Sequence, residues 1–168
     1  MQDLTISLLN LAKSEDKKPK APVDVSKITE NILKQNRRRL EGKTLTIEIA
    51  KNVSAKTDSE DLRQLFTILI DNAIKYSDQR IDLRLASGSL TIENDGATIP
   101  ATELPKIFDR FYRADKSRHS DGFGLGLSIA KNIVEKYNWQ IYVSSSDQKT
   151  KFTIVFDHHQ LPPQNHVS

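Results

Sequence analysis

The 168-residue chain has no cysteine, and this absence removes three kinds of chemistry. Without thiols, the chain cannot form a disulfide framework, a thiolate metal site or a cysteine nucleophile. It also lacks any apolar run near the roughly 20 residues that cross a bilayer, and its start lacks the pattern of a signal peptide. We therefore expect a soluble domain, in a reducing compartment such as the cytoplasm, that makes no membrane contact of its own.

The chain has a small net charge and few glycines. The formal charge of +3 is spread over both signs, which does not favour nucleic acid as a partner. A hydrophobic content of 37% is sufficient for one domain with a single core. Of only six glycines, four lie in two short motifs, at Gly96, Gly122, Gly124 and Gly126. This clustering indicates that the backbone comes close to another group there.

Residues 62–77, LRQLFTILIDNAIKYS, contain a polar triplet inside an apolar helical pattern. The apolar positions recur at helical spacing and predict a helix that faces the core: Leu62, Leu65, Phe66, Leu69, Ile70 and Ala73. Asn72, Lys75 and Tyr76 are related as i, i+3 and i+4, so they share a neighbouring face. An amide oxygen can ligate a hard cation, an ammonium can contact phosphate, and a ring can cover a sugar or base. The triplet is typical of a nucleotide site.

With three later motifs, this stretch resembles the catalytic ATP-binding domain of two-component sensor histidine kinases, which has the Bergerat or GHKL ATPase fold. The similar motifs are the N-box (residues 65–77), the G1 box NDGATIP (94–100), the F-box IFDRFYR (107–113) and the G2 box GFGLGLSI (122–129). Their family order makes the match specific. The resemblance implies an α/β two-layer sandwich with a mixed, mostly antiparallel sheet, three main helices on one face and a mobile ATP lid.

The resemblance also implies ATP and Mg²⁺ as cofactors, with Asn72 as the metal ligand. The implied nucleotide-binding residues are Asn72, Lys75, Tyr76, Asn94, Gly96, Thr98, Ile99, Arg113, Gly122, Gly124, Leu125, Gly126 and Leu127. Lys75 and Arg113 are expected at phosphates, together with the G2-box backbone that precedes a predicted helix. Tyr76 is expected against ribose or base, and Asn94 and Gly96 at adenine. No residue of this chain is assigned a catalytic role.

Asn94 has the same strand parity as Leu90 and Ile92, so we expect its amide to point toward the core. A buried amide needs hydrogen-bond partners. Two partners remain open at this point. One is the turn that follows Asn94, and the other is the adenine edge, which an Asp meets at this position in the family.

Three positions depart from the family pattern: Asn94 in place of Asp, Thr98 in place of the last G1 glycine, and Ile68. Hydrolytic relatives have a water-activating glutamate at the position of Ile68, and an aliphatic side chain cannot act as a base. Two alternatives to a kinase remain. One is a nucleotide-binding regulatory or docking module without phosphotransfer, and the other is a hydrolytic switch like gyrase or Hsp90, which Ile68 disfavours.

Three parts are predicted along the chain: a remnant of a dimerisation and phosphoacceptor hairpin with its linker (1–20), the ATP-binding catalytic domain (21–157) and a mobile tail (158–168). Within the domain we predict a helix from Asp24 to about Glu41, a half-buried strand over 44–49, a hairpin over 81–94, a helix over 128–137 and strands over 141–144 and 152–156. Thr57 and Glu60 have the spacing of a capping box for the central helix. A lid is expected over 108–120.

None of the four histidines lies in a helical His-Glu or His-Asp sequence, so the phosphoacceptor is expected outside this chain. The resemblance then implies that the chain binds Mg-ATP and donates the γ-phosphate to a histidine of the dimerisation hairpin of its parent kinase. Through that hairpin, its further partner is a response regulator. The implied location is a cytoplasmic domain of a membrane-anchored sensor kinase in a bacterium.

Overall fold

The computed structural model describes residues 21–113 and 124–156. The elements are β1 (Pro22–Asp24), α2 (Val25–Gln35), α3 (Arg37–Leu40), β2 (Thr44–Ile49), β3 (Ser54–Lys56), α4 (Ser59–Tyr76), β4 (Arg80–Ala86), β5 (Ser89–Asp95), the 3₁₀ helix η1 (Leu104–Phe108), α5 (Gly126–Lys136), β6 (Gln140–Ser146) and β7 (Lys149–Val155). The remnant expected over 1–20, most of the expected lid, Gly122 and the tail all lie outside the described residues.

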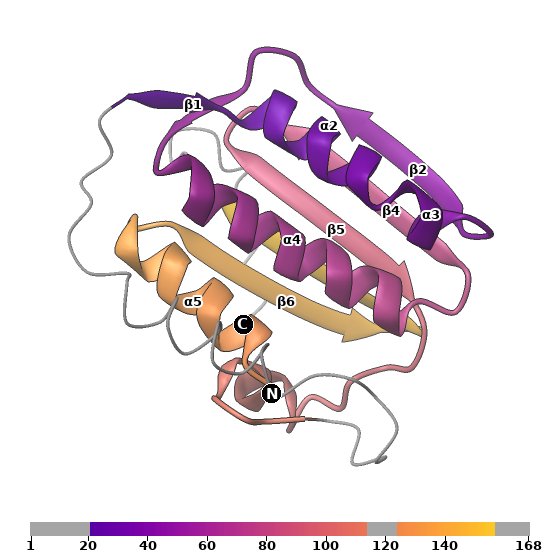
Figure 1. The fold of residues 1–168 in the computed structure, drawn as a ribbon. Coiled ribbons are helices and arrows are strands. Elements are labelled where there is room, and N and C mark those ends of the chain that lie inside the picture. Colours follow the sequence, from indigo (N-terminus) through magenta and orange to yellow (C-terminus); the bar gives the residue numbers. More distant parts are fainter. Residues whose placement is uncertain (1–20, 114–123, 157–168) are drawn as a thin grey trace, which may run out of the picture.

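Two layers make up the fold (Figure 1). One is a five-stranded sheet in the order β2-β4-β5-β7-β6. β2 runs parallel to β4, and the other neighbouring strands are antiparallel. The helices α2, α4 and α5 lie side by side on one face of this sheet, and a separate ladder joins β1 to β3 (Figure 1). The expected two-layer sandwich with a mostly antiparallel sheet is therefore confirmed.

The central helix α4 buries all six residues of the predicted apolar stripe. Its amino end is not held by the expected capping box. Instead, the carboxylate of Asp58 accepts hydrogen bonds from the backbone N–H groups of Glu60 (2.8 Å) and Asp61 (3.4 Å). Thr57 is buried one residue earlier, and its hydroxyl donates to the carbonyl of Asp58 at 3.4 Å instead of capping the helix. The cap of α4 is therefore Asp58 rather than Thr57, one residue later than predicted, and both residue types are common helix caps.

The predicted helix over residues 24–41 is two helices. Its start is confirmed, because Asp24 accepts from the backbone N–H of Lys27 at 2.9 Å. At Asn36, however, the side-chain amide donates to the carbonyl of Ile32 at 3.0 Å and ψ is 7°, so α2 ends and the short α3 begins. An asparagine side chain that competes for helical carbonyls explains this break.

The strand β2 differs from the expected half-buried strand. Leu45 and Ile47 point to the helix side of the sheet, yet 38% and 43% of their surfaces remain exposed. β2 is an edge strand, and among the described helices α2 and α3 lie over it (Figure 1). An alternating pattern identifies the apolar face of a strand, but it does not show how much of that face is covered.

Near the opposite edge of the sheet, α5 begins at Gly126 rather than at residue 128. Gly126 and Leu127 therefore belong to its first turn. Trp139 packs in the core as expected, with its ring centroid 5.2 Å from that of Tyr137 and 5.7 Å from that of Phe156. No helix among the described residues is long and apolar enough to span a membrane.

Candidate functional site

One face of α4 connects two of the glycine motifs. A Cβ atom placed on Gly96 would lie 2.3 Å from the carbonyl oxygen of Tyr76, so the G1 turn packs against the carboxyl end of α4. A Cβ atom on Gly126 would lie 3.4 Å from Cγ2 of Ile68. Ile68, Asn72 and Tyr76 are four residues apart and follow one face over about 12 Å of helix. Asn72 therefore lies between the contacts to the two motifs.

Gly124 connects the third motif, the F-box, to the same region. The backbone N–H of Phe111 donates to the carbonyl of Gly124 at 2.9 Å. A Cβ atom on Gly124, whose φ is +68°, would lie 2.6 Å from the carbonyl oxygen of Tyr112. Arg113, which is half-buried, directly follows Tyr112. The structure thus brings the start of the predicted lid to the G2 box.

The polar triplet of α4 is accessible. Asn72 is half-buried, whereas Lys75 is exposed and Tyr76 is 50% exposed. The ammonium of Lys75 lies 5.2 Å from the centroid of the Tyr76 ring. The neighbouring Asp71 forms an ion pair with Arg39.

The side chains near Asn72 limit how a metal could be held. Within residues 21–113 and 124–156, no three His, Cys, Asp or Glu side chains gather closely enough to bind a metal ion. Mg²⁺ keeps several waters and commonly takes one or two protein ligands together with substrate phosphates. One amide oxygen, from Asn72, therefore fits an ion that arrives with a polyphosphate rather than an ion resident in the protein.

Asn94 is buried at the end of β5, as the parity argument predicted. Its Nδ2 donates to the carbonyl of Asp95 at 2.8 Å, so the following turn is one partner of the amide. Thr150 on β7 lies directly opposite Asn94 in the ladder and is also buried. The sequence reasoning missed Thr150, although it shares the buried parity of Phe152 and Ile154.

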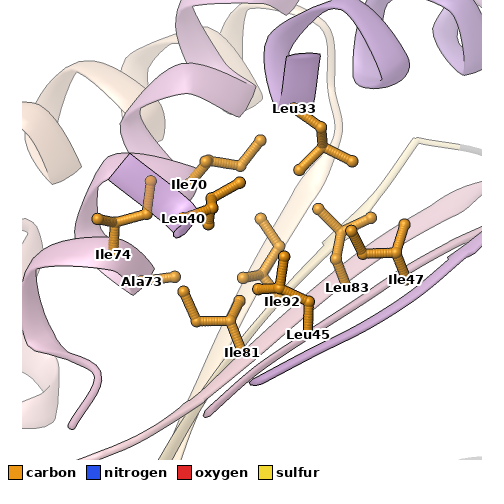
Figure 2. A pocket seen from close by; sticks show the side chains of 10 residues that line it. All are labelled: Leu33, Leu40, Leu45, Ile47, Ile70, Ala73, Ile74, Ile81, Leu83 and Ile92. Carbon is orange, nitrogen blue, oxygen red and sulfur yellow. The ribbon is translucent and has the colours of Figure 1, made fainter. Parts of the chain in front are cut away.

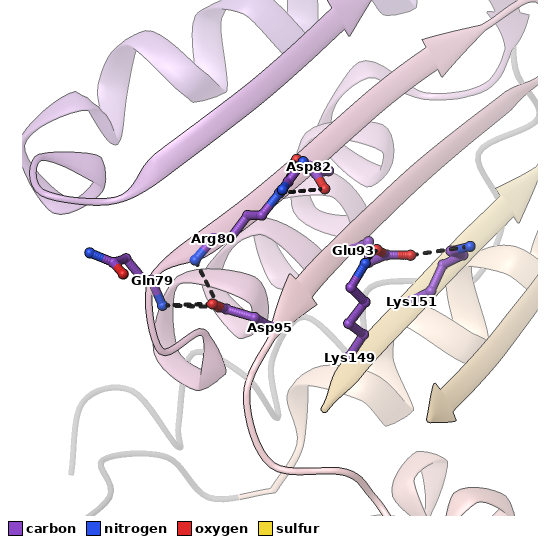
Figure 3. A network of polar contacts seen from close by, with 7 residues as sticks. All are labelled: Gln79, Arg80, Asp82, Glu93, Asp95, Lys149 and Lys151. Carbon is purple, nitrogen blue, oxygen red and sulfur yellow. Dashed lines mark hydrogen bonds and ion pairs between the residues drawn. The ribbon is translucent and has the colours of Figure 1, made fainter. Parts of the chain in front are cut away.

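Asp95 fastens the G1 turn to the chain that leaves α4 (Figure 3). Its carboxylate accepts from the backbone N–H groups of Gln79 (2.9 Å) and Arg80 (2.7 Å). Burial raises the pKa of Asp95, but the backbone N–H groups of Arg80, Gln79 and Asp78 and the charge of Lys43 together outweigh it, so the pKa lies below its ordinary value. Figure 3 also shows Glu93 between Lys149 and Lys151 on the outer face of the sheet.

The remaining predicted G1 residues, Thr98 and Ile99, contact the β6–β7 hairpin. The hydroxyl of Thr98 accepts from the backbone N–H of Gln148, and the backbone N–H of Ile99 donates to the hydroxyl of Ser145. The sequence did not indicate a role for Ser145 or Gln148, because no local pattern predicts that residues 145–148 contact residues 98 and 99.

The amino end of α5 presents backbone donors. Among the side chains that the structure describes, none caps this helix, and the N–H of Ile129 is bonded to the carbonyl of Leu125 at 3.0 Å. The amides that precede Ile129 have no partner within an α-helix, and the helix dipole makes this end positive. The side chain of Leu125 is 4% exposed and belongs to the core, so only its backbone is available to a ligand.

A separate apolar pocket lies between the helices and β2, β4 and β5 (Figure 2). All of its lining side chains are apolar, and its cavity volume is about 10 Å³. This volume is too small for a nucleotide, and the lining offers no polar group to orient one. The pocket is a packing gap under the edge strand and not part of the candidate site.

Comparison with known proteins identifies the class. The family of histidine kinase-, DNA gyrase B-, and HSP90-like ATPases matches residues 57–160, which is more than half of the chain. The chain belongs to this family.

Within this family, the similar proteins include sensor histidine kinases. Sensor histidine kinase YkoH of Bacillus subtilis is 36% identical over 93% of this chain and 36% of its own length. Sensor protein CiaH of Streptococcus pneumoniae is 38% identical over 92% of this chain and 37% of its own length. The chain thus spans about a third of the length of these relatives. The solved structure of the mycobacterial sensor histidine kinase MprB has a TM-score of 0.72 and 28% identity, covering 81% of this chain and 97% of that one.

Proposed function

We propose that this chain is the catalytic, ATP-binding part of a two-component sensor histidine kinase. It binds Mg-ATP along α4 and donates the γ-phosphate to a histidine of the dimerisation hairpin of its parent kinase, which passes it to a response regulator. The observation that carries this proposal is the arrangement on α4, where Asn72 lies between the Gly126 contact at Ile68 and the Gly96 contact at Tyr76. The names of its relatives support the same class.

Gly126 gives the phosphate end of the site independent support. Its φ is not in the left-handed region, and an added Cβ would make only an ordinary contact with Ile68. Alanine is more favourable than glycine by about 1 kcal/mol in a helix interior, which is an upper limit for the first turn. Because the fold does not demand glycine here, the close approach of a phosphate to the first turn of α5 accounts for it. Lys75 and Arg113 are the side chains proposed to contact the phosphates.

At the base end, Asn94, Thr150 and the backbone near Gly96 and Ile99 are proposed to receive adenine, with Tyr76 beside the ribose or base. Asn72 would hold the Mg²⁺, which neutralises phosphate charge when bound. The chain's own contribution is to orient the nucleotide and to expose its γ-phosphate to an imidazole from outside. This requires positioning rather than a covalent step on the chain.

Hydrolysis is disfavoured because Ile68 occupies the position one helical turn before Asn72. Its side chain packs against Gly126 and cannot take a proton from water. We therefore propose a phosphotransferase, placed in a cytoplasmic domain of a membrane-anchored bacterial sensor kinase.

The test combines the chain, γ-labelled Mg-ATP and a separately prepared dimerisation hairpin of the parent kinase. We expect label on the hairpin histidine, none on the chain alone, and phosphate release far slower than about 1 per second. Asn72→Ala is expected to abolish transfer and the tightening of ATP binding by Mg²⁺, because one metal ligand is lost. Arg63→Ala, an exposed change on the same helix, is the control.

Two results would contradict the proposal. Equal Mg-ATP binding by wild type and Asn72→Ala would show that α4 does not hold the metal. Steady phosphate release at about 1 per second or faster, with no label on the hairpin, would indicate a hydrolase.

A further inference from the structure

The loop that follows β5 is joined to the β6–β7 hairpin by three hydrogen bonds, two at Gln148 in the turn and one at Ser145 on β6. The N–H of Gly96 donates to the carbonyl of Gln148 at 2.9 Å. The N–H of Gln148 donates to Oγ1 of Thr98 at 3.0 Å. The N–H of Ile99 donates to Oγ of Ser145 at 2.8 Å. Both backbone groups of Gln148 are therefore engaged by the G1 loop.

The β6–β7 turn has an unusual sequence for its conformation. Asp147 and Gln148 have φ values of 51° and 57°, between the paired residues Ser146 and Lys149. Two-residue hairpin turns with two positive φ values favour Asn, Asp or Gly at the first position and Gly at the second, so Asp147 suits its position and Gln148 does not. The left-handed conformation is unfavourable for other residues. At Gln148, this left-handed conformation is stabilised by the hydrogen bond that Gly96 donates to its carbonyl and by the one that its N–H donates to Thr98.

Ser145 extends this connection to the buried end of the sheet. Its hydroxyl lies 2.9 Å from Oγ1 of Thr150 and 3.2 Å from the carbonyl of Lys149. Thr150 is paired with Asn94 in the β5–β7 ladder. The backbone of Ile99 is thus linked through Ser145 to Thr150, which lies opposite Asn94. Loop and strand positions proposed for the base are held in one hydrogen-bonded unit.

We propose that Thr98 is a positioning residue for the base end of the nucleotide site, acting through the Gln148 backbone; this inference rests on the proposed nucleotide binding. Thr98 stands where the resemblance leads one to expect glycine, and its β-branched side chain supplies the acceptor that a glycine lacks. The hydroxyl holds the loop from 96 to 99 against the β6–β7 turn. The loop is therefore ordered before the nucleotide binds, which lowers the entropy lost on binding.

Position 98 allows a test that leaves the core intact, because Thr98 is exposed. Thr98→Val keeps the side-chain shape and removes the acceptor, while Thr98→Ser keeps the acceptor. We expect Thr98→Val to weaken ADP binding about three- to tenfold, as the loss of one modest hydrogen bond predicts. Thr98→Ser is expected to stay within about twofold of the wild type. Both are measured by calorimetric titration of the whole chain.

The control is Thr153→Val, which makes the same chemical change on the outer face of β7, where the Thr153 hydroxyl contacts that of Thr91. It should leave ADP affinity unchanged. Hydrogen exchange at the Gln148 amide should become faster in Thr98→Val and remain slow in Thr98→Ser.

The outcomes separate this inference from the proposed function. If the wild type binds no adenine nucleotide, the proposed function itself is wrong and the inference falls with it. If the wild type binds ADP and Thr98→Val binds it equally well, only the inference is overturned. Equal weakening in Thr98→Val, Thr98→Ser and Thr153→Val also overturns it, because that pattern reports a general loss of stability.

Discussion

Around the G1 turn, carboxylate, hydroxyl and backbone groups tie each segment to its neighbours, whereas no side chain of the described residues caps the first turn of α5. Asp95 holds the chain after α4, and Thr98 and the Ile99 backbone hold the β6–β7 hairpin. The leading amides of α5 have no acceptor within their own helix. The glycines differ in the same way, since the fold requires Gly96 but not Gly126. In the proposed nucleotide site, the base end is thus a preformed frame, and the phosphate end is a set of backbone donors.

The largest effect is expected from Gly96→Ala. The added Cβ would lie 2.3 Å from the carbonyl oxygen of Tyr76, and φ at this position is +135°. Neither backbone segment can shift without disturbing Asp95 or α4. We expect the free energy of unfolding in urea to fall by about 2–4 kcal/mol, and nucleotide binding to fall with it.

Gly42→Ala is the matched control for that change. Gly42 also has a positive φ, +85°, but nothing lies within 4 Å of its added Cβ. It should cost only the conformational term of about 1–2 kcal/mol. A Gly96→Ala protein no less stable than Gly42→Ala would mean that the G1 turn is not packed tightly against α4.

Gly126→Ala should separate binding from folding. The added Cβ makes an ordinary contact with Ile68, and alanine favours the helix, so stability should stay equal or rise by up to about 1 kcal/mol. ATP affinity should fall about tenfold, because the methyl group blocks a close approach to the first-turn amides. Unchanged ATP affinity would show that α5 does not receive the phosphates. Ser128→Ala, which removes a side-chain bond to the carbonyl of Leu125 in the same turn, tests whether helix-end stability alone affects binding.

Asp95→Asn should give the smallest effect, and it depends on pH. The pKa of Asp95 is lowered in the folded state, so its ionised form adds stability above the unfolded pKa of about 3.9. That contribution disappears as pH falls through the lower, folded pKa. At pH 7 we expect the variant to be less stable by about 1 kcal/mol, because the bonds to Gln79 and Arg80 are solvent-exposed. The two proteins should converge in acid.

Urea denaturation of both proteins at several pH values between about 2 and 7 measures this difference. Glu30→Gln, which also removes one negative charge but at an exposed position of α2, is the control. A stability difference that is the same at every pH would contradict the assigned role of the Asp95 carboxylate.

Local patterns were sufficient for several features. The spacing of six apolar residues identified the buried side of α4, and strand parity placed Asn94 inside. Both succeed because helix and strand periods determine which side chains share a face. The four motifs in order led to the family and to the two-layer fold. Two of their glycines also marked where backbone segments come close, Gly96 at Tyr76 and Gly124 at Tyr112.

Only the tertiary structure decided which of these segments meet and how completely they are covered. Leu45 and Ile47 follow a buried pattern but lie on an edge strand that the helices cover partly. Thr98 meets Gln148 across 50 residues of sequence, and Ile99 meets Ser145 across 46. Periodicity is a property of neighbours along the chain, whereas the contact between two loops depends on the order of strands in the sheet. That order places the end of β5 beside the β6–β7 turn, because β7 is the common neighbour of β5 and β6.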